Sequence, residues 1–207
     1  MIDLRGHQKL EWPNELRPRG EGTWEKETFD LWWDRNKTLI AHIHPVVAEQ
    51  WIYRHWSNSP YCHLYLDRIT WRLETWPTKR LLAEVVRPDP ADDINLNHDW
   101  ALYRDRDLEP AVTMRATGTW NIPIVIVDAL HGALRFNGAD PRRFHLIEGH
   151  QRMRCLAAFQ HHAKCATDHE LFVLSYPDVD EPPLGNFISL ARQRAAVRLL
   201  RSRWRCL

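Results

Sequence analysis

The sequence lacks a long run of apolar residues. No stretch of its 207 residues approaches the length that a helix needs to cross a bilayer, and residues 1–10 have no apolar centre of the kind found in secretory signals. Closely spaced cysteine pairs are also missing, because the four cysteines are scattered: Cys62, Cys155, Cys165 and Cys206. These absences favour a soluble, cytoplasmic protein with reduced thiols and no attachment to a membrane.

A strong charge of one sign is missing as well. The chain has 28 lysines and arginines against 27 aspartates and glutamates, which gives a formal net charge of +1. Bulk attraction to nucleic acid is therefore not expected, and binding of that kind would need a local basic patch. The 11 tryptophans favour a folded chain over a disordered one, since disordered chains are poor in aromatic residues.

Composition divides the chain into four parts. Residues 1–22 are polar and interrupted by prolines and glycines, which predicts an extended arm. Residues 23–63 are rich in tryptophan and other apolar residues, and a helical region beginning near Thr23 is expected there. Residues 64–183 are expected to form the main domain, and residues 184–207 a basic C-terminal helix. Core packing explains the tryptophans more simply than a ligand cage does.

The clearest local pattern is a strand that turns into a helix at Gly149. The segment from Phe144 to Ile147 is short and rich in apolar residues, as a strand requires. After the glycine, one face is marked at the helical spacing i, i+3, i+4, i+7 by Met153, Leu156, Ala157 and Gln160. The first turn of a helix has backbone N–H groups without partners and a positive dipole end, and a glycine there lets a ligand approach. This junction favours an anion, most of all a phosphate.

Other elements are expected around this junction. Residues 109–115 are predicted to form a helix that Gly118 ends. Residues 120–128 hold the near-continuous β-branched run of a central strand covered on both faces. Residues 69–82 are expected to contain the first strand and its exit, and residues 171–176 the last strand.

Two segments resemble the ParB/sulfiredoxin superfamily. The turn, Leu146-Ile147-Glu148-Gly149-His150-Gln151-Arg152, is similar to the strand, turn and helix signature of that family. The upstream stretch from Met114 to Val127 is similar to the family's helix end, glycine and strand. The resemblance covers roughly residues 69–176. It implies an α+β fold with a small mixed sheet and packed helices, and a nucleotide or phosphate pocket at Gly149.

Members of this superfamily include DNA-partition CTPases, nucleases, ATP-using sulfinic acid reductases and a free-serine kinase. The reductases carry a cysteine directly after the turn glycine, and this chain has His150 there. The partition proteins have a Gly-Glu-Arg-Arg type of turn and a downstream DNA-binding domain, for which too few residues remain. The acid-Gly-His-x-Arg pattern is most similar to the kinase-like and nuclease-like branches. The fold does not choose between them.

The resemblance implies roles for the residues of the turn. Gly149, Arg152 and the backbone N–H groups of His150 and Gln151 would hold the phosphates of a nucleoside triphosphate with Mg²⁺. Glu148 would orient the pocket or act as a base, and His150 would donate a proton to a bridging oxygen. Arg80 either faces this pocket or lies on the surface. In a purely structural interpretation Glu148 complements the helix dipole, and His150 and Arg152 are solvated.

Two segments carry residue types that bind metals. Magnesium would suit carboxylates of the acidic stretch from Asp89 to Glu109, although a solvated loop is favoured. These carboxylates are Asp92, Asp93, Asp105 and Asp107. A zinc site would need ligands from a segment that a polar loop explains better, because it has no paired cysteines. Its candidate ligands are His161, His162, Cys165 and His169.

The C-terminal helix is the strongest charge feature. Its arginines occur without any acidic residue, so they would either contact a phosphate backbone or neutralise the acidic stretch inside the fold. The candidates for contact with nucleic acid are Arg194, Arg198, Arg201 and Arg205. The sequence thus predicts a nucleotide-binding protein that hydrolyses or transfers a phosphate at Gly149. The alternatives are a non-catalytic DNA-associated or regulatory module and a metal-dependent nuclease, and a homodimer stays open.

Overall fold

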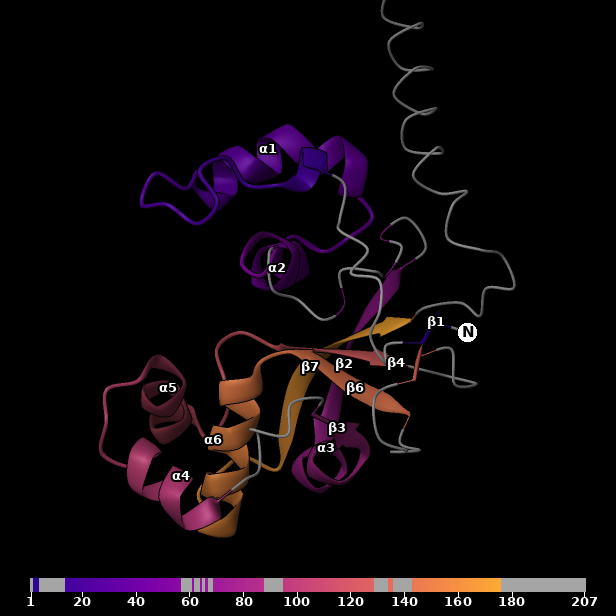
Figure 1. The fold of residues 1–207 in the computed structure, drawn as a ribbon. Helices are drawn as coiled ribbons and strands as arrows, with labels where there is room; N and C mark the ends of the chain where they lie inside the picture. The colour runs from indigo at the N-terminus through magenta and orange to yellow at the C-terminus, as the bar shows by residue number, and fades with distance from the viewer. Residues whose placement is uncertain are drawn as a thin grey trace, which may run out of the picture.

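The computed structural model describes residues 2–3, 14–56, 61, 64, 66, 69–87, 95–128, 134–135 and 143–175. These residues form an α+β structure with a five-stranded mixed sheet and six α-helices (Figure 1). None of the helices in this part of the chain is long and apolar enough to cross a membrane. The expected α+β fold with a small mixed sheet is confirmed.

The sheet has the strand order β2–β7–β4–β6–β3. Its strands are β2 (Thr70–Pro77), β3 (Val85–Val86), β4 (Ile124–Asp128), β6 (Phe144–Glu148) and β7 (Asp168–Ser175). The pairs β2–β7 and β4–β6 are antiparallel, whereas β7–β4 and β6–β3 are parallel. A separate parallel pair joins β1 (Ile2–Asp3) to β5 (Leu134–Arg135).

Strand β4 occupies the middle of the sheet because its sequence suits burial on both faces. Every residue of β4 is buried. Val125 and Val127 pack in one apolar cluster, while Ile124 and Ile126 pack in the other. Successive side chains of a strand point to opposite faces, so an unbroken apolar run reaches both cores. The predicted central strand is confirmed, although it begins later than expected.

One face of the sheet is covered by the N-terminal layer (Figure 1). It consists of α1 (Phe29–Ile40), α2 (Pro45–Val47) and the π-helix η2 (Ala48–Tyr53). Trp32 and Trp51 are fully buried there, in one cluster with Val125 and Phe172 of the sheet. Burying such large rings is a major source of stability, and the predicted core role is confirmed for these two tryptophans. Trp24, in contrast, is 91% exposed.

The opposite face carries the other helices (Figure 1). They are α3 (Thr78–Glu84), α4 (Leu96–Tyr103), α5 (Glu109–Thr117) and α6 (His150–His161). Leu156 and Phe159 of α6 are buried in one cluster with Leu146 of β6 and Ile126 of β4. Helix α5 ends at Gly118, which has a left-handed conformation with a φ of 75°, and the predicted end of this helix is confirmed.

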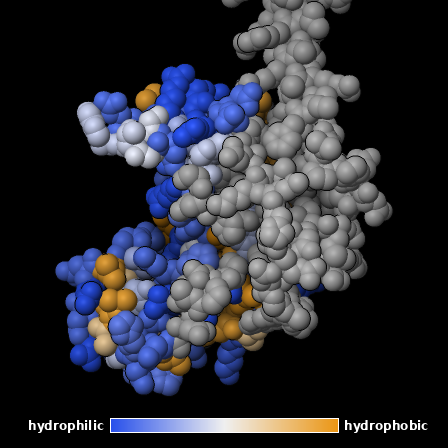
Figure 2. All heavy atoms as spheres, viewed as in Figure 1, coloured by the Kyte–Doolittle hydropathy of each residue, from blue (hydrophilic) through white to orange (hydrophobic). Residues whose placement is uncertain are grey.

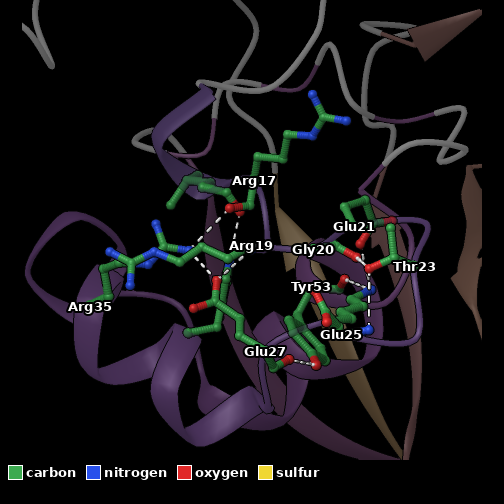
Figure 3. A network of polar contacts seen from close by, with 12 residues as sticks. Arg17, Arg19, Gly20, Glu21, Thr23, Glu25, Glu27, Arg35 and Tyr53 are labelled. Carbon is green, nitrogen blue, oxygen red and sulfur yellow. Dashed lines mark hydrogen bonds and ion pairs between the residues drawn. The ribbon is translucent and has the colours of Figure 1, made fainter.

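The described residues directly before α1, 14–28, form turns and a short helix, while the arm predicted over residues 1–22 lies partly outside the described residues. Residues Asn14–Leu16 form the short 3-10 helix η1, and Leu16 is buried. The indole Nε1 of Trp32 donates to the carbonyl of Leu16 at 2.6 Å. Figure 3 shows Arg35 donating to backbone carbonyls of this segment and pairing with Glu27. Trp32 and Arg35 of α1 therefore donate hydrogen bonds to backbone carbonyls of residues 15–17. The prolines and glycines around these residues do not by themselves predict a regular element.

Helix α1 begins at Phe29 and not near Thr23. Residues 20–25 form turns instead, in which the hydroxyl of Thr23 accepts from the N–H of Glu25 and donates to the carbonyl of Gly20 (Figure 3). Threonine favours such local hydrogen bonds over a helix.

The surface in Figure 2 is largely hydrophilic where it is coloured, with small separate groups of hydrophobic residues around α4 and α5.

Several expectations fall outside the described residues. These are the carboxylates of Asp92 and Asp93 and the basic helix of residues 184–207. The arginines Arg194, Arg198, Arg201 and Arg205 of that helix, together with Cys62 and Cys206, belong to the same group.

Candidate functional site

The junction between strand and helix lies where the sequence predicts it, with Gly149 between β6 and α6. Its φ of 106° and ψ of 25° fall in a region that residues with side chains rarely adopt. A Cβ atom here would lie 2.5 Å from Cγ2 of Ile124 and 3.3 Å from Nε of Arg152. The glycine therefore lets the turn pack closely on β4, which is a different reason from the approach of a ligand.

Helix α6 begins without a side-chain cap. Gly149 has no side chain to accept from the N–H groups of the first turn, and this turn contains no acidic residue. The first helical hydrogen bond runs from the N–H of Met153 to the carbonyl of Gly149 at 2.9 Å. The dipole and the N–H groups at this end of the twelve-residue helix favour an anion.

A β-bulge directs Glu148 toward the N-terminal layer. In the pairing with β4, Leu146 and Glu148 lie opposite consecutive residues, so β6 holds one extra residue, Ile147. Ile147 packs in the cluster of the N-terminal layer, and Glu148 contacts His55 of the same layer. Strict alternation would place Glu148 on the face of Leu146, which packs with α6. The bulge thus brings the carboxylate to the side of η2.

The carboxylate of Glu148 is held by three groups. Oε2 lies 3.1 Å from Nε2 of His55, Oε1 lies 3.7 Å from Nη2 of Arg152, and the N–H of Gly149 donates to the carboxylate. Burial acts to raise the pKa of Glu148, but the hydrogen bond and charge of His55 and the charge of Arg152 together bring this pKa below its ordinary value. Glu148 is therefore ionised at neutral pH.

Arg152 is buried between three parts of the fold. Its side chain is 8% exposed. Nη1 donates to the carbonyl of Ile122 at 2.8 Å, and Nη2 donates to Oε1 of Gln50 at 3.1 Å. Burial lowers the pKa of the guanidinium, and the nearby charge of Glu148 acts against this. The sequence predicts that Arg152 contacts a phosphate, whereas its donors here serve protein acceptors that fix the turn.

A buried polar atom beside Arg152 has no hydrogen-bond partner in the described structure. It is Nε2 of Gln50, whose residue is 2% exposed. Oε1 of the same amide accepts from Nη2 of Arg152, which places Nε2 near the guanidinium of Arg152. A buried donor without an acceptor costs about 1–3 kcal/mol, so this position suits an additional acceptor atom.

Gln50 and His55 belong to the site but have no counterpart among the candidates from the sequence. Gln50 lies on η2 and His55 follows it, in a region for which the sequence predicts only core packing. Gln50 and Arg152 are 102 positions apart, so no local spacing connects them. The structure adds one signal for Gln50. It is a polar residue with buried neighbours on a π-helix, and π-helical turns are found frequently at functional sites.

The other predicted site residues divide into two groups. His150 is half-buried and Gln151 is exposed, both in the first turn of α6 beside Gly149. Arg80 lies elsewhere, with its guanidinium 3.5 Å from the ring centroid of Trp76 and 3.1 Å from Glu84. The same guanidinium is 5.8 Å from the ring of Phe144, at the opposite end of β6. Arg80 is thus separated from the turn.

The zinc ligands considered from the sequence do not converge. The part of the chain that the structure describes holds no group of three or more His, Cys, Asp or Glu residues that would suit a metal ion. The ring of His162 stacks on Trp100 at 4.0 Å, and the thiol of Cys165 donates to Gln160 at 3.0 Å. A structural role in the loop explains these side chains.

The contacts of two magnesium candidates and of Cys155 are explained by the fold alone. Asp105 and Asp107, considered for magnesium, pair with Arg104 and Arg115. Cys155 is buried, and burial raises the pKa of its thiol to about 12. A thiol with such a pKa is almost never ionised at neutral pH and is a poor nucleophile, so Cys155 acts as a small apolar residue of the core.

Comparison of the chain with models of known families, with curated proteins and with solved structures finds no match.

Proposed function

We propose that the chain binds the phosphates of a nucleotide at the amino-terminal end of α6 and hydrolyses or transfers one of them. The observation that carries this proposal is the uncapped first turn of α6 behind the left-handed Gly149. The buried donor of Gln50, whose amide oxygen accepts from Arg152 of that helix, supports it independently. The likeness of the turn to the acid-Gly-His-x-Arg pattern of the ParB/sulfiredoxin superfamily points in the same direction.

In this proposal the residues of the turn share the work differently from the expectation based on sequence. The backbone N–H groups of α6 and the exposed side chain of Gln151 bind the phosphate. Arg152 positions the turn through Ile122 and Gln50 and does not contact the ligand. The ligand in this proposal is a nucleoside triphosphate with Mg²⁺. Phosphate oxygens and few protein ligands commonly hold this ion, so the site needs no dedicated set of metal ligands.

The alternative functions remain predictions from the sequence. A DNA-associated module rests on Arg194, Arg198, Arg201 and Arg205, which lie outside the described residues. For a nuclease, no feature of the described residues adds to the pattern of the turn.

A thermal melt of the full chain tests the proposal. We expect the melting temperature to rise with at least one of ATP, CTP and GTP in the presence of Mg²⁺, because a ligand of the native state stabilises it by mass action. At a concentration of 100 times Kd the stabilisation is about 2.7 kcal/mol. If none of the three nucleotides changes the melting temperature at millimolar concentration, the proposal is wrong.

A charge change in the first turn then locates the site. Gln151→Glu adds a carboxylate at the second position of α6. Its negative charge interacts favourably with the helix dipole but repels a phosphate. We expect a stable protein that has lost the rise caused by the nucleotide. The matched control is Asn97→Asp, which adds the same charge at the second position of α4 and should keep the rise. Equal rises in both variants would place the nucleotide elsewhere.

A further inference from the structure

The two edge strands of the five-stranded sheet differ in length. Strand β3 at one edge has two residues, whereas β2 at the other edge, Thr70–Pro77, has eight. Among the described residues, β7 is the one strand that pairs with β2, and their register runs through all of β2 without a bulge. Long edge strands are usually blunted by a bulge, an internal proline or a lysine. Strand β2 has none of these, since its proline is its last residue.

The outer edge of β2 presents the backbone groups of alternate residues. The N–H of Thr78 donates to the carbonyl of Thr167, which continues the ladder between β2 and β7. In an antiparallel ladder hydrogen-bonded pairs alternate with non-hydrogen-bonded pairs, so Arg72 and Glu74 direct their backbone groups to β7. The residues between and beside them direct their N–H and C=O groups away from β7, and these are Trp71, Leu73 and Thr75.

The surroundings of these residues agree with an open edge. Glu170 of β7 lies opposite Thr75, and its carbonyl accepts from Nε1 of Trp120, which precedes β4, at 2.7 Å. Glu170 thus directs this carbonyl away from β2, as a non-hydrogen-bonded pair requires. Leu73 is 49% exposed and Trp71 is 37% exposed. The outer side of β2 is therefore accessible to a further strand.

The charges of β2 make it complementary to a second copy of itself. Arg72 and Glu74 share one face of the sheet, where they lie opposite the buried residues Val173 and Leu171. If two copies of β2 run antiparallel with Leu73 opposite Leu73, Arg72 of each copy lies opposite Glu74 of the other. A shift by two residues in either direction would place Arg72 opposite Arg72 or Glu74 opposite Glu74. Like charges in such positions are destabilising, so the charges select the first register.

The two charged side chains already lie close together at this edge. The guanidinium of Arg72 pairs with the carboxylate of Glu74, and the side chains are 45% and 29% exposed, respectively. Nη1 of Arg72 also donates to the hydroxyl of Ser175 at 2.7 Å. In the register with Leu73 opposite Leu73, Arg72 and Glu74 of the second copy form a non-hydrogen-bonded pair, whose Cα atoms lie about 4.5 Å apart. The two ion pairs would then form one group of charges with alternating signs.

We infer that β2 pairs with β2 of a second copy of this chain in an antiparallel, two-fold symmetric dimer, with Leu73 on the axis. Trp71, Leu73 and Thr75 each exchange two hydrogen bonds with the residue opposite, and the two sheets become one continuous sheet. A two-fold contact uses the same surface on both chains, so the assembly closes at two copies. This inference is independent of the proposed function.

Sedimentation equilibrium of the full chain tests the dimer. We expect the wild type to show a reversible equilibrium between monomer and dimer at micromolar concentrations. Leu73→Lys places two like charges opposite each other at the axis, so this variant should stay monomeric over the same range. The matched control is Leu31→Lys, which replaces a leucine of α1 that is 63% exposed and should keep the dimer.

Reversal of the charges tests the register. Arg72→Glu and Glu74→Arg each give the edge charges of one sign, so each variant alone should lose the dimer. A mixture of the two variants restores opposite charges across the contact and should form a heterodimer. A cooperative thermal melt of each variant shows that it is folded.

The inference is overturned by any of four results. They are a wild type that stays monomeric at several hundred micromolar, an assembly larger than two chains, a dimer that persists in Leu73→Lys, and folded charge variants that stay monomeric when mixed. The predicted heterodimer, with each charge variant monomeric alone, supports both the edge and the register.

Discussion

Gly149 combines a positive φ with a contact that leaves no room for a side chain. Its φ is 106°, and an added Cβ would lie 2.5 Å from Cγ2 of Ile124. A left-handed conformation costs other residues about 1–2 kcal/mol, and overpacking a core costs about 1–3 kcal/mol. We therefore expect Gly149→Ala to lower the free energy of unfolding by about 2–5 kcal/mol, as measured by denaturation with urea.

Gly22→Ala separates the two causes. Gly22 also has a positive φ, of 81°, but an added Cβ would meet no atom within 4 Å. This variant should lose only the conformational part, about 1–2 kcal/mol. If Gly149→Ala is no less stable than Gly22→Ala, the contact with Ile124 does not constrain the turn.

At the scale of elements, His169 connects β7 with two neighbouring segments. Its ring nitrogens lie 2.9 Å from the hydroxyl of Thr78 on α3 and 2.7 Å from that of Thr119. The ring also lies 4.8 Å from that of Trp120, and the residue is 1% exposed. The sequence offers His169 as one candidate zinc ligand in a segment better explained as a polar loop, and in the structure this residue is a polar link within the core.

The pH dependence of stability follows from this burial. Burial lowers the pKa of His169 from 6.5, although the carbonyl of Ala166 and the charge of Asp168 act against this. Burial also lowers the pKa of His44. The unfolded chain then binds these protons more readily than the folded one, so stability is full above pH 6.5 and falls as the pH drops below it. The slope is at most about 1.4 kcal/mol per pH unit for each histidine.

Urea denaturation at pH 8, 7, 6 and 5 measures this slope. We expect His169→Gln to flatten the decline below pH 6.5, while His98→Gln, an exposed site, leaves it unchanged. The range stops at pH 5 because Glu148, whose pKa is below its ordinary 4.5, loses its stabilising contacts only in more acidic solution. An unchanged slope in His169→Gln would assign the pH dependence to other groups.

At the scale of the whole molecule, Arg152 joins the N-terminal layer to the sheet and to α6. It donates to Gln50 of η2 and to the carbonyl of Ile122, and it lies beside Glu148 of β6. Truncating one member of a buried charged network leaves the others without a partner. We expect Arg152→Ala to lower the free energy of unfolding by about 3–5 kcal/mol, as measured by urea denaturation.

Arg104→Ala is the matched control for this prediction. Arg104 pairs with Asp105 on the surface, where both side chains are more than half exposed, and such pairs contribute about 0–1 kcal/mol. A change for Arg152→Ala as small as that for Arg104→Ala would contradict the role of Arg152 as a link between layers.

The sequence by itself determined four of the five strands of the sheet, all except β3, and the strand-to-helix junction. The β-branched run of β4, the apolar strand before Gly149 and the glycine that ends α5 depend on local sterics and on the period of apolar residues. These properties act over a few residues, so they can be recognised without knowing the rest of the fold. For the same reason the turn from Glu148 to Arg152 was found as one unit.

Only the tertiary structure decided which distant groups meet at that turn. The bulge at Ile147 directs Glu148 to His55, and Gln50 comes to Arg152 across 102 positions. The guanidinium of Arg80 lies over the ring of Trp76 and not at the turn. Such contacts depend on how the layers pack and on which buried polar groups can form hydrogen bonds with each other. The local pattern of apolar residues along the chain does not predict these contacts.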